Sequence, residues 1–380
     1  MTQPGRLREL AALFLKLGTI GFGGPVAHIA MTHDEVVVRR NWFDDKQYAD
    51  MIAMSNLVPG PNSTEVAMHV GRERAGRRGL VLAGVCFILP ASLMMGVLAW
   101  AYDRYGAEPQ AEWLLYGVKP VVIALIVQAI WLLGRATLRG VLVPAVGVLA
   151  VLAAFAGVPE LLILAAAGSG VVIWRGGAHL ARGTGALTLL PVLSLAGGGG
   201  GVTVASVGLV PIFLQFLWIG SVLFGSGYVL LAFLQGQLVD GRGWLTEQQL
   251  LDAVAIGQIT PGPLFTTATF IGYLLAGVPG AIVATVGIFL PAFIIVTLTG
   301  PLIPRLRRSP TFSAFLDGVV AASLALMVWV AGVLGREAIV DGWTIALALI
   351  SAVVLFRWRV SPVLLVAGGA VAGLLIEGLL

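Results

Sequence analysis

The stretch Asn56-Leu57-Val58-Pro59-Gly60-Pro61-Asn62-Ser63-Thr64-Glu65 interrupts an apolar region, and it returns as Gln258-Ile259-Thr260-Pro261-Gly262-Pro263-Leu264-Phe265-Thr266-Thr267. Proline cannot continue a helix, and glycine adopts backbone angles that other residues avoid. Each copy therefore predicts the end of one helix and the start of another. In a membrane such a break is tolerated only where protein or a water-filled cavity covers the freed backbone groups. The two breaks are therefore our candidate ligand site.

The composition places the chain in a membrane. Of its 380 residues, 58% are hydrophobic and 11% are charged, whereas a soluble protein carries about 25% charged residues. We expect an all-α polytopic membrane protein. The single cysteine excludes an intramolecular disulfide, and the four histidines lack metal-ligand spacing. No P-loop and no nucleophile–base set is found. We therefore predict no metal, no cofactor, no nucleic-acid partner and no enzymatic activity.

The chain is an internal duplication. A gapless alignment of residues 14–61 with 216–263 gives 15 identities in 48 positions, and Pro90 later pairs with Pro291. Duplication is a common basis of transporter folds. We predict a first repeat at 1–180, a Gly-rich linker at 181–207 with a short apolar helix near Leu187–Leu195, and a second repeat at 208–380.

The distribution of Lys and Arg predicts how the repeats are oriented, because these residues mark cytoplasmic loops. An inverted duplication places 16 of them inside and 5 outside, whereas parallel repeats give 11 against 10 because Arg305–Arg308 change side. The inverted arrangement has about five plus five transmembrane helices and two re-entrant hairpins at the Pro-Gly-Pro segments, with both termini outside.

Inverted repeats would bring two helix N-termini toward the middle of the membrane. Such ends carry unpaired N–H groups and a partial positive charge that suit an anion. We expect a small oxyanion to be held there by backbone N–H groups, hydroxyls and amides. The candidate binding residues are Lys16, Gly23, Gly24, Asn56, Pro59, Gly60, Pro61, Asn62, Ser63, Thr64, Ser226, Gln258, Pro261, Gly262, Pro263, Thr266 and Thr267.

Several of these residues also have a structural interpretation. Asn62 and Glu65 have the spacing of a capping box, yet an acid at membrane depth is also a candidate for proton coupling. Asn56 and Gln258 occupy the same repeat position and could satisfy the carbonyls freed by the break. Lys16 either attracts the anion or extends its ammonium to the membrane interface.

Glycines interrupt the first long helix of each repeat. Gly21-Phe22-Gly23-Gly24-Pro25 and Phe224-Gly225-Ser226-Gly227 lie at the same depth. Small residues also serve helix packing in membranes, but the shared position favours a broken helix beside each hairpin. Lys119 is a weaker case than Lys16, His28 ranks low as a proton carrier, and Arg72, Arg74, Arg77 and Arg78 indicate a cytoplasmic anchor.

The motifs resemble those of the chromate ion transporter family. The first set is Phe22-Gly23-Gly24-Pro25-Val26-Ala27-His28-Ile29, Leu57-Val58-Pro59-Gly60-Pro61-Asn62 and Phe87-Ile88-Leu89-Pro90. Gln258-Ile259-Thr260-Pro261-Gly262-Pro263 and Thr266-Thr267-Ala268-Thr269-Phe270-Ile271-Gly272-Tyr273 resemble the second-half motifs of its two-domain members. The resemblance covers nearly the whole chain apart from the linker. Many members carry an acid directly after the first Pro-Gly-Pro, where this chain has Asn62.

The resemblance implies a chromate exporter in the inner membrane of a bacterium or archaeon, with Lys16 and the Pro-Gly-Pro regions as important positions. We expect a secondary transporter that works by alternating access, with the lipid bilayer and an oxyanion as partners and a homodimer as one possible assembly. A carrier for sulfate or another oxyanion and an anion channel stay open as alternatives.

Overall fold

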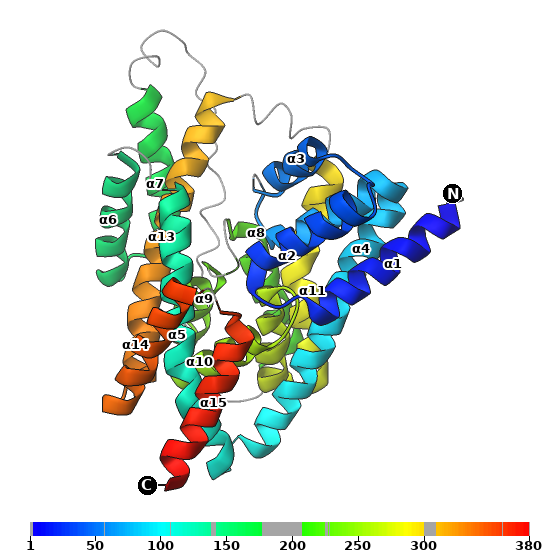
Figure 1. Cartoon of the computed structure of the whole chain (residues 1–380). Coiled ribbons are helices and arrows are strands. Elements are labelled where there is room, and N and C mark those ends of the chain that lie inside the picture. Colours follow the sequence, from blue (N-terminus) through cyan, green and yellow to red (C-terminus); the bar gives the residue numbers. More distant parts are fainter. Residues whose placement is uncertain are drawn as a thin grey trace.

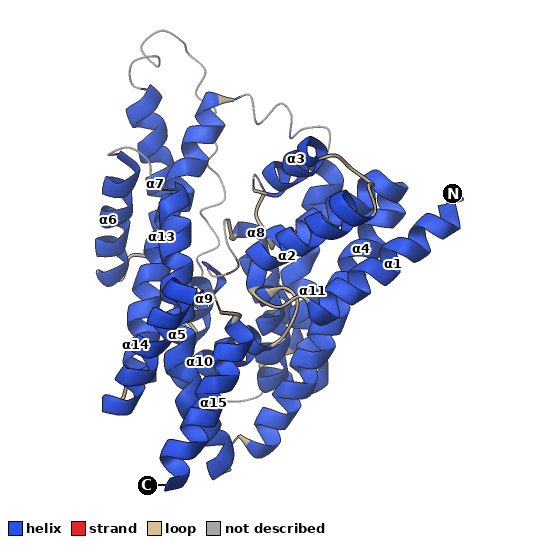
Figure 2. Cartoon of the chain, viewed as in Figure 1, coloured by secondary structure: helices blue, strands red, loops and turns tan. Residues whose placement is uncertain are grey.

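The computed structural model describes residues 3–56, 58–106, 108–137, 142–176, 207–224, 227, 229–299, 309–358 and 360–379. Within these ranges the chain forms helices joined by loops (Figure 2). The expected linker, apart from Val207, lies outside the described residues, as do the Leu187–Leu195 helix, Ser226 and Arg305–Arg308.

The duplication extends to each local element of the first part of both repeats. In the first repeat the elements are α1 (Gln3–Ile20), α2 (Gly24–His33), the π-helix η1 (Asp34–Arg39), α3 (Asp45–Ser55) and α4 (Asn62–Tyr105). Their counterparts are α8 (Leu209–Val222), α9 (Val229–Leu234), the π-helix η3 (Gln235–Asp240), α10 (Glu247–Ile259), and the 3₁₀-helix η4 (Leu264–Thr266) followed by α11 (Thr267–Thr299).

Capping chemistry repeats as well. α3 begins with a capping box between Asp44 and Gln47, and α10 begins with one between Thr246 and Gln249. In this motif two side chains satisfy backbone N–H groups that the first helical turn leaves without partners. A capping box, with Asp in one repeat and Thr in the other, therefore determines where the helix before each Pro-Gly-Pro segment begins.

A sharp turn divides both α4 and α11. Ala75–Gly76 and Ala276–Gly277 have non-helical angles, with φ of 64° at Gly76 and 61° at Gly277. The turn splits α4 into a short arm, 62–74, and a long arm, 77–105. The two arms pack so closely against each other that a Cβ at Gly71 would overlap the carbonyl of Gly79. Each Pro-Gly-Pro segment is therefore followed by a short helix that reverses direction.

The remaining six helices pack mainly against helices of the opposite repeat, so that the two repeats exchange them. They are α5 (Pro109–Thr137), α6 (Leu142–Phe155) and α7 (Glu160–Gly176) in the first repeat, and α13 (Pro310–Ala338), α14 (Gly342–Trp358) and α15 (Pro362–Leu379) in the second. α6 and α7 pack on α13, whereas α14 and α15 pack on α5. Figure 1 shows these six helices gathered beside the bundle that contains α1–α4, α8 and α11.

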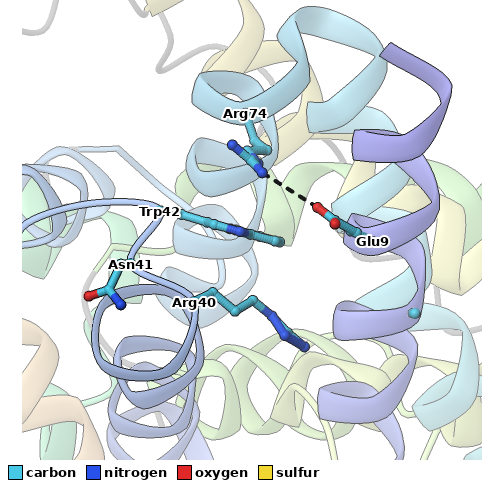
Figure 3. A pocket seen from close by; sticks show the side chains of 6 residues that line it. Glu9, Arg40, Asn41, Trp42 and Arg74 are labelled. Atoms are coloured by element: carbon cyan, nitrogen blue, oxygen red, sulfur yellow. Dashed lines mark hydrogen bonds and ion pairs between the residues drawn. The ribbon is translucent and has the colours of Figure 1, made fainter. Parts of the chain in front are cut away.

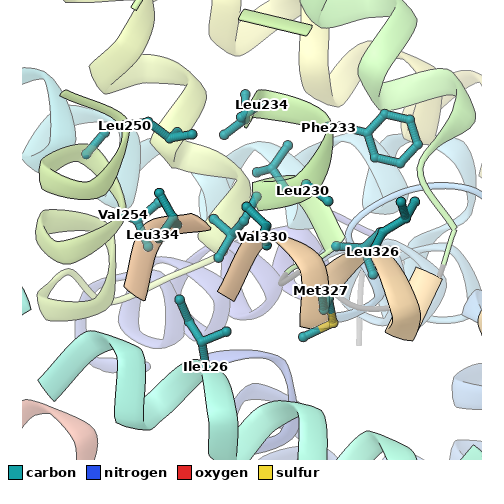
Figure 4. Close-up of a cluster of buried hydrophobic side chains, with 14 of the residues drawn as sticks. Ile126, Leu230, Phe233, Leu234, Leu250, Val254, Leu326, Met327, Val330 and Leu334 are labelled. Carbon is teal, nitrogen blue, oxygen red and sulfur yellow. The ribbon is translucent and has the colours of Figure 1, made fainter. Parts of the chain in front are cut away.

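A continuous apolar core joins the two bundles. Leu326, Met327, Val330 and Leu334 of α13 are buried among Leu230, Phe233 and Leu234 of α9, Leu250 and Val254 of α10, and Ile126 of α5 (Figure 4). α13 therefore packs against α9 and α10 of its own repeat and against α5 of the first repeat.

Equivalent helices run in opposite directions. Leu80 near the start of the long arm of α4 clusters with Val296 near the end of α11, and Gly84 faces Phe293. In Figure 1 the teal α5 and the orange α13 likewise run oppositely. The long arms of α4 and α11 are therefore antiparallel.

Among the described residues, four helices are long and apolar enough to cross a membrane: Asn62–Tyr105, Pro109–Arg135, Leu264–Leu298 and Pro310–Ala338. Five shorter apolar helices accompany them, at Leu142–Phe155, Leu209–Val222, Val229–Asp240, Gly342–Trp358 and Pro362–Gly378. The expectation of a polytopic, all-helical membrane protein is confirmed.

Candidate functional site

Both predicted helix breaks are present in each repeat. α1 ends at Ile20 and α2 begins at Gly24, and α3 ends at Ser55 before α4 begins at Asn62. In the second repeat α8 ends at Val222, and α10 ends at Ile259. The prediction of a break in the first helix of each repeat is confirmed, and in the first repeat the break contains Gly21 and Gly23.

The breaks of one repeat bind those of the other. The Gly60 N–H donates to the Leu223 carbonyl across 2.8 Å, and the Gly262 N–H donates to the Gly21 carbonyl across 2.8 Å. Gly60 and Gly262 are equivalent, as are Gly21 and Leu223. Each Pro-Gly-Pro loop therefore uses the broken helix of the other repeat to satisfy backbone groups that the break exposes.

The glycine of each loop permits a close approach between the repeats. Gly60 has φ of 143° and Gly262 has φ of 92°, angles that favour glycine. A Cβ at Gly60 would lie 3.3 Å from the Cβ of Ala292 and would overlap Glu65 Oε1. A Cβ at Gly262 would instead overlap the Cβ of Ala91.

His28 connects the first break to the start of α4. Its Nε2 lies 2.7 Å from the Gly21 carbonyl, and its Nδ1 lies 3.4 Å from the Ser63 hydroxyl. A ring that donates from Nε2 to the carbonyl accepts the Ser63 proton at Nδ1. The sequence analysis gave His28 a low rank as a proton carrier. The signal that could have identified it as a site residue is its position, four residues after Gly24 on a helix that begins at a break.

The first turn of α4 is not a capping box. The N-cap position is Pro61, and Asn62 donates from Nδ2 to Asn56 Oδ1 across 2.8 Å. The capping interpretation of Asn62 and Glu65 is therefore wrong, because the helix begins one residue earlier than that motif requires. Within the described residues, Asn62 Oδ1, Thr64 Oγ1 and both carboxylate oxygens of Glu65 are buried without a hydrogen-bond partner.

A narrow pocket joins the glycine break of the first repeat to the Pro-Gly-Pro loop of the second. It is lined by Gly23, Gly24 and Pro25 and by Gly257, Gln258, Thr260, Gly262 and Leu264. Gln258 is buried, and within the described residues its Nε2 has no hydrogen-bond partner. The structure thus brings together four of the predicted residues, Gly23, Gly24, Gln258 and Gly262.

Other predicted residues are engaged elsewhere. Thr266 and Thr267 are buried, and their hydroxyls donate to the Pro263 and Leu264 carbonyls of their own turn, each across 2.8 Å. The Lys16 ammonium binds Glu35 Oε1 at 2.7 Å. That hydrogen bond from Lys16, with the charges of Arg40, Lys16 and Arg39, lowers the pKa of Glu35 below its ordinary value despite burial.

Lys119 has a buried partner that the sequence did not reveal. Its ammonium lies 2.9 Å from Asp252 Oδ1, and Tyr102 donates to Asp252 Oδ2 across 2.7 Å. These groups line a pocket of about 400 Å³ between α5, α10 and the ends of α4, α13 and α15. The ion pair therefore links α5 of the second bundle to α10 beside the broken helices.

A cavity of about 530 Å³ lies near the arginine-rich turn (Figure 3). Trp42 lies between two guanidinium groups, 5.5 Å from that of Arg40 and 4.7 Å from that of Arg74. Arg74 also pairs with Glu9 at 3.4 Å, and Arg40 pairs with Glu35 at 3.1 Å. The carboxylates balance this cationic surface. Across the described residues, no three His, Cys, Asp or Glu side chains are arranged to hold a metal ion.

Comparison with known proteins identifies relatives over nearly the whole chain. The chromate transporter family model matches residues 8–173 and 210–374. The chain is 35% identical to the chromate transport protein of Cupriavidus metallidurans over 378 residues, which cover 98% of this chain and 94% of the relative. It is 34% identical to the Pseudomonas aeruginosa chromate transport protein over 85% of this chain and 80% of the relative.

A third relative, the probable chromate transport protein of Synechococcus elongatus, is 31% identical over 97% of this chain and 95% of the relative. No solved structure matches the chain.

Proposed function

The chain belongs to the chromate transporter family, and from this we propose that it is a secondary transporter that exports chromate across the inner membrane. The relatives are named as chromate transport proteins, which supports chromate as the substrate and transport rather than catalysis as the activity. One observation supports the site most directly: the two Pro-Gly-Pro loops meet the broken helices of the opposite repeat through equivalent hydrogen bonds.

The proposed anion site lies at this meeting of breaks. The polar side chains that we assign to it are those of Ser63 and Thr64, in the first turn of α4, and of Gln258, which lines the narrow pocket. Helix N-termini favour negative charge, and a tetrahedral dianion would be held by several such donors at once. Glu65 belongs to the proposal as the candidate for proton coupling, and Lys16 as a residue that attracts the anion.

The orientation follows from the charge distribution. We place the turn of α4 that carries Arg72–Arg78 on the cytoplasmic side. The chain then has ten crossings and two re-entrant hairpins, with both termini outside. The antiparallel course of α4 and α11 supports this inverted arrangement. Outward movement of a dianion is then favoured by a negative interior, at about 2.3 kcal/mol per charge per 100 mV.

Alternating access requires two units that move relative to each other. The exchanged bundle of α5–α7 and α13–α15 and the bundle of broken helices are suited to these roles, because α10 and α9 contact α5 and α13 at their boundary. A carrier for sulfate or another oxyanion would use the same dipoles. An anion channel would line a pore with the same hairpins.

Chromate flux in everted vesicles, with sulfate as competitor, tests this proposal. We expect saturable chromate uptake and counterflow, with weak inhibition by sulfate. Lys16→Ala and Asn62→Ala should each reduce saturable flux, whereas Glu73→Gln, an exposed position on the same arm, serves as the matched control. Non-saturable flux would favour a channel, and unchanged transport in both variants would refute the site assignment.

A further inference from the structure

One face of the short arm of α4 carries three ionisable side chains. Glu65, His69 and Arg72 are spaced i, i+4 and i+7, so they share a helix face. Arg72 donates to the Val296 carbonyl across 2.7 Å and to the Thr297 carbonyl across 3.4 Å, which places this face against the C-terminal part of α11. The face extends from the Pro-Gly-Pro break to the exposed turn at 76–78.

Two of the three side chains are buried and carry polar atoms without partners in the described part of the chain. Glu65 is 0% exposed and His69 is 3% exposed. Within the described residues, neither Glu65 oxygen nor His69 Nε2 has a hydrogen-bond partner. An ionised carboxylate in such surroundings is strongly disfavoured, so this arrangement fits a Glu65 that holds a proton. On a helix, side chains at i and i+4 are neighbours with Cβ atoms about 5–6 Å apart, so Glu65 and His69 lie side by side on this face.

The surrounding charged groups are already paired or distant. α1 brings Glu9 and Lys16, which bind Arg74 and Glu35; α2 brings His28, bound to Gly21 and Ser63. α3 brings the exposed Asp50, and α10 brings Asp252, which binds Lys119 and Tyr102. The sequence of α11 contains no Asp, Glu, Lys, Arg or His. Glu65 and His69 therefore form a pair set apart from these ionic networks.

We propose that Glu65 takes up a proton together with each oxyanion, that His69 delivers this proton from the exposed turn at 76–78, and that Glu65 releases it with the oxyanion on the other side of the membrane. The inference rests on the proposed oxyanion transport. Ionised Glu65 would repel a dianion in the first turn of α4, whereas the protonated acid removes that charge. Proton uptake and anion binding therefore favour each other, as linkage requires.

The proton transfer is chemically balanced. A hydronium ion that enters from the exposed turn gives its proton to His69 and leaves as water. His69 then breaks this N–H bond, and the proton forms an O–H bond on the Glu65 carboxylate. The imidazole returns to its neutral form and the carboxylate becomes a neutral acid. A neutral imidazole can accept on one nitrogen and donate from the other, which suits His69 to a relay along this face.

The second repeat lacks this pair. The positions that correspond to His69 and Arg72 are Phe270 and Tyr273, and Thr266 or Thr267 corresponds to Glu65. Phe270 packs on Tyr102, with ring centroids 5.3 Å apart. The proposed proton path therefore opens toward only one side of the molecule, the side that carries Arg72–Arg78.

Full-length protein in proteoliposomes with a clamped membrane potential tests the inference. Chromate flux and internal pH are recorded together, in alkaline buffer so that chromate is the dianion. We expect the wild type to move protons with chromate in a fixed ratio. Glu65→Gln should carry chromate without protons. His69→Gln should keep the ratio but slow both fluxes roughly 100-fold, and added imidazole should restore the rate. Glu73→Gln should match the wild type.

The outcomes separate the relay from the transport function. Because the ratio of protons to chromate is measured in the same vesicles, it does not depend on how much of a variant folds. Chromate transport without proton movement in the wild type would overturn the relay alone, as would an unchanged ratio in Glu65→Gln or an unchanged rate in His69→Gln. A wild-type protein that carries no oxyanion would overturn the proposed function and the relay together.

Discussion

The short arm 62–74 and its counterpart at 264–275 occupy equivalent places but carry different side chains. The first has Glu65, His69 and Arg72 on the face toward α11. The second fills the corresponding positions with threonine, Phe270 and Tyr273. Backbone turns, capping boxes and loop hydrogen bonds are alike in the two repeats. The comparison teaches that the backbone chemistry is the same in both repeats, whereas only the short arm of the first repeat carries an acid and a histidine.

The largest expected effect concerns two equivalent aspartates. Asp252 is buried and paired with Lys119, whereas its counterpart Asp50 is exposed. Asp252→Asn should lower the free energy of unfolding by about 3–5 kcal/mol, because the buried ammonium loses its charged partner. Asp50→Asn should change it by less than about 0.5 kcal/mol. Denaturant unfolding in detergent measures both.

A double variant controls for the ion pair. Lys119→Met with Asp252→Leu removes both charges and should recover most of the lost stability. Equal effects of Asp252→Asn and Asp50→Asn would show that the link between α5 and α10 does not contribute to stability.

A smaller effect distinguishes the two loop glycines. Gly60→Ala and Gly262→Ala should each cost about 1–3 kcal/mol of backbone strain, plus the overlap of the new methyl group. For Gly60 the overlap is with Glu65, and for Gly262 it is with Ala91. Glu65→Ala should therefore partly restore the melting temperature of Gly60→Ala but not of Gly262→Ala, and Ala91→Gly should do the reverse. Restoration of Gly262→Ala by Glu65→Ala, or of Gly60→Ala by Ala91→Gly, would contradict the assigned contacts.

The smallest expected effect is a pH-dependent change in melting temperature on substitution of Lys16, which its counterpart Trp218 should not show. Because the Lys16 hydrogen bond lowers the pKa of Glu35, this pair stabilises the fold above the pKa of an unfolded glutamate. The stabilisation is lost as the pH falls through the lower pKa of the folded protein. Lys16→Met should thus lower the melting temperature at neutral pH, and the difference should shrink in acid.

Trp218→Met provides the control for that titration. Trp218 packs on Phe233, with ring centroids 6.0 Å apart, and carries no charge. Its effect on the melting temperature should keep the same size across the acid range. A Lys16→Met difference that is equally independent of pH would exclude the Glu35 ion pair as its cause.

The sequence predicted those features that local chemistry determines. Pro59-Gly60-Pro61 and Gly23-Gly24 interrupt helices through the chemistry of their own backbone, and the duplication was visible because identical residues recur in order. Features that depend on packing were not predictable. Glu35 as the partner of Lys16, Asp252 as the partner of Lys119, and α11 as the surface facing His69 all depend on which helices meet. Periodicity identifies a helix face but not the helix that covers it.

The exchange of helices between the repeats has a consequence for synthesis of the chain. α5 is complete at Thr137, but α14 and α15, which cover it, follow only at 342–379. Gly117 of α5 allows such close contact that a Cβ there would overlap the backbone of Gly369. Until the last helices emerge from the ribosome, lipid or the insertion machinery must cover this surface of α5. A truncation at the C-terminus therefore damages the first repeat, whose own sequence it leaves intact.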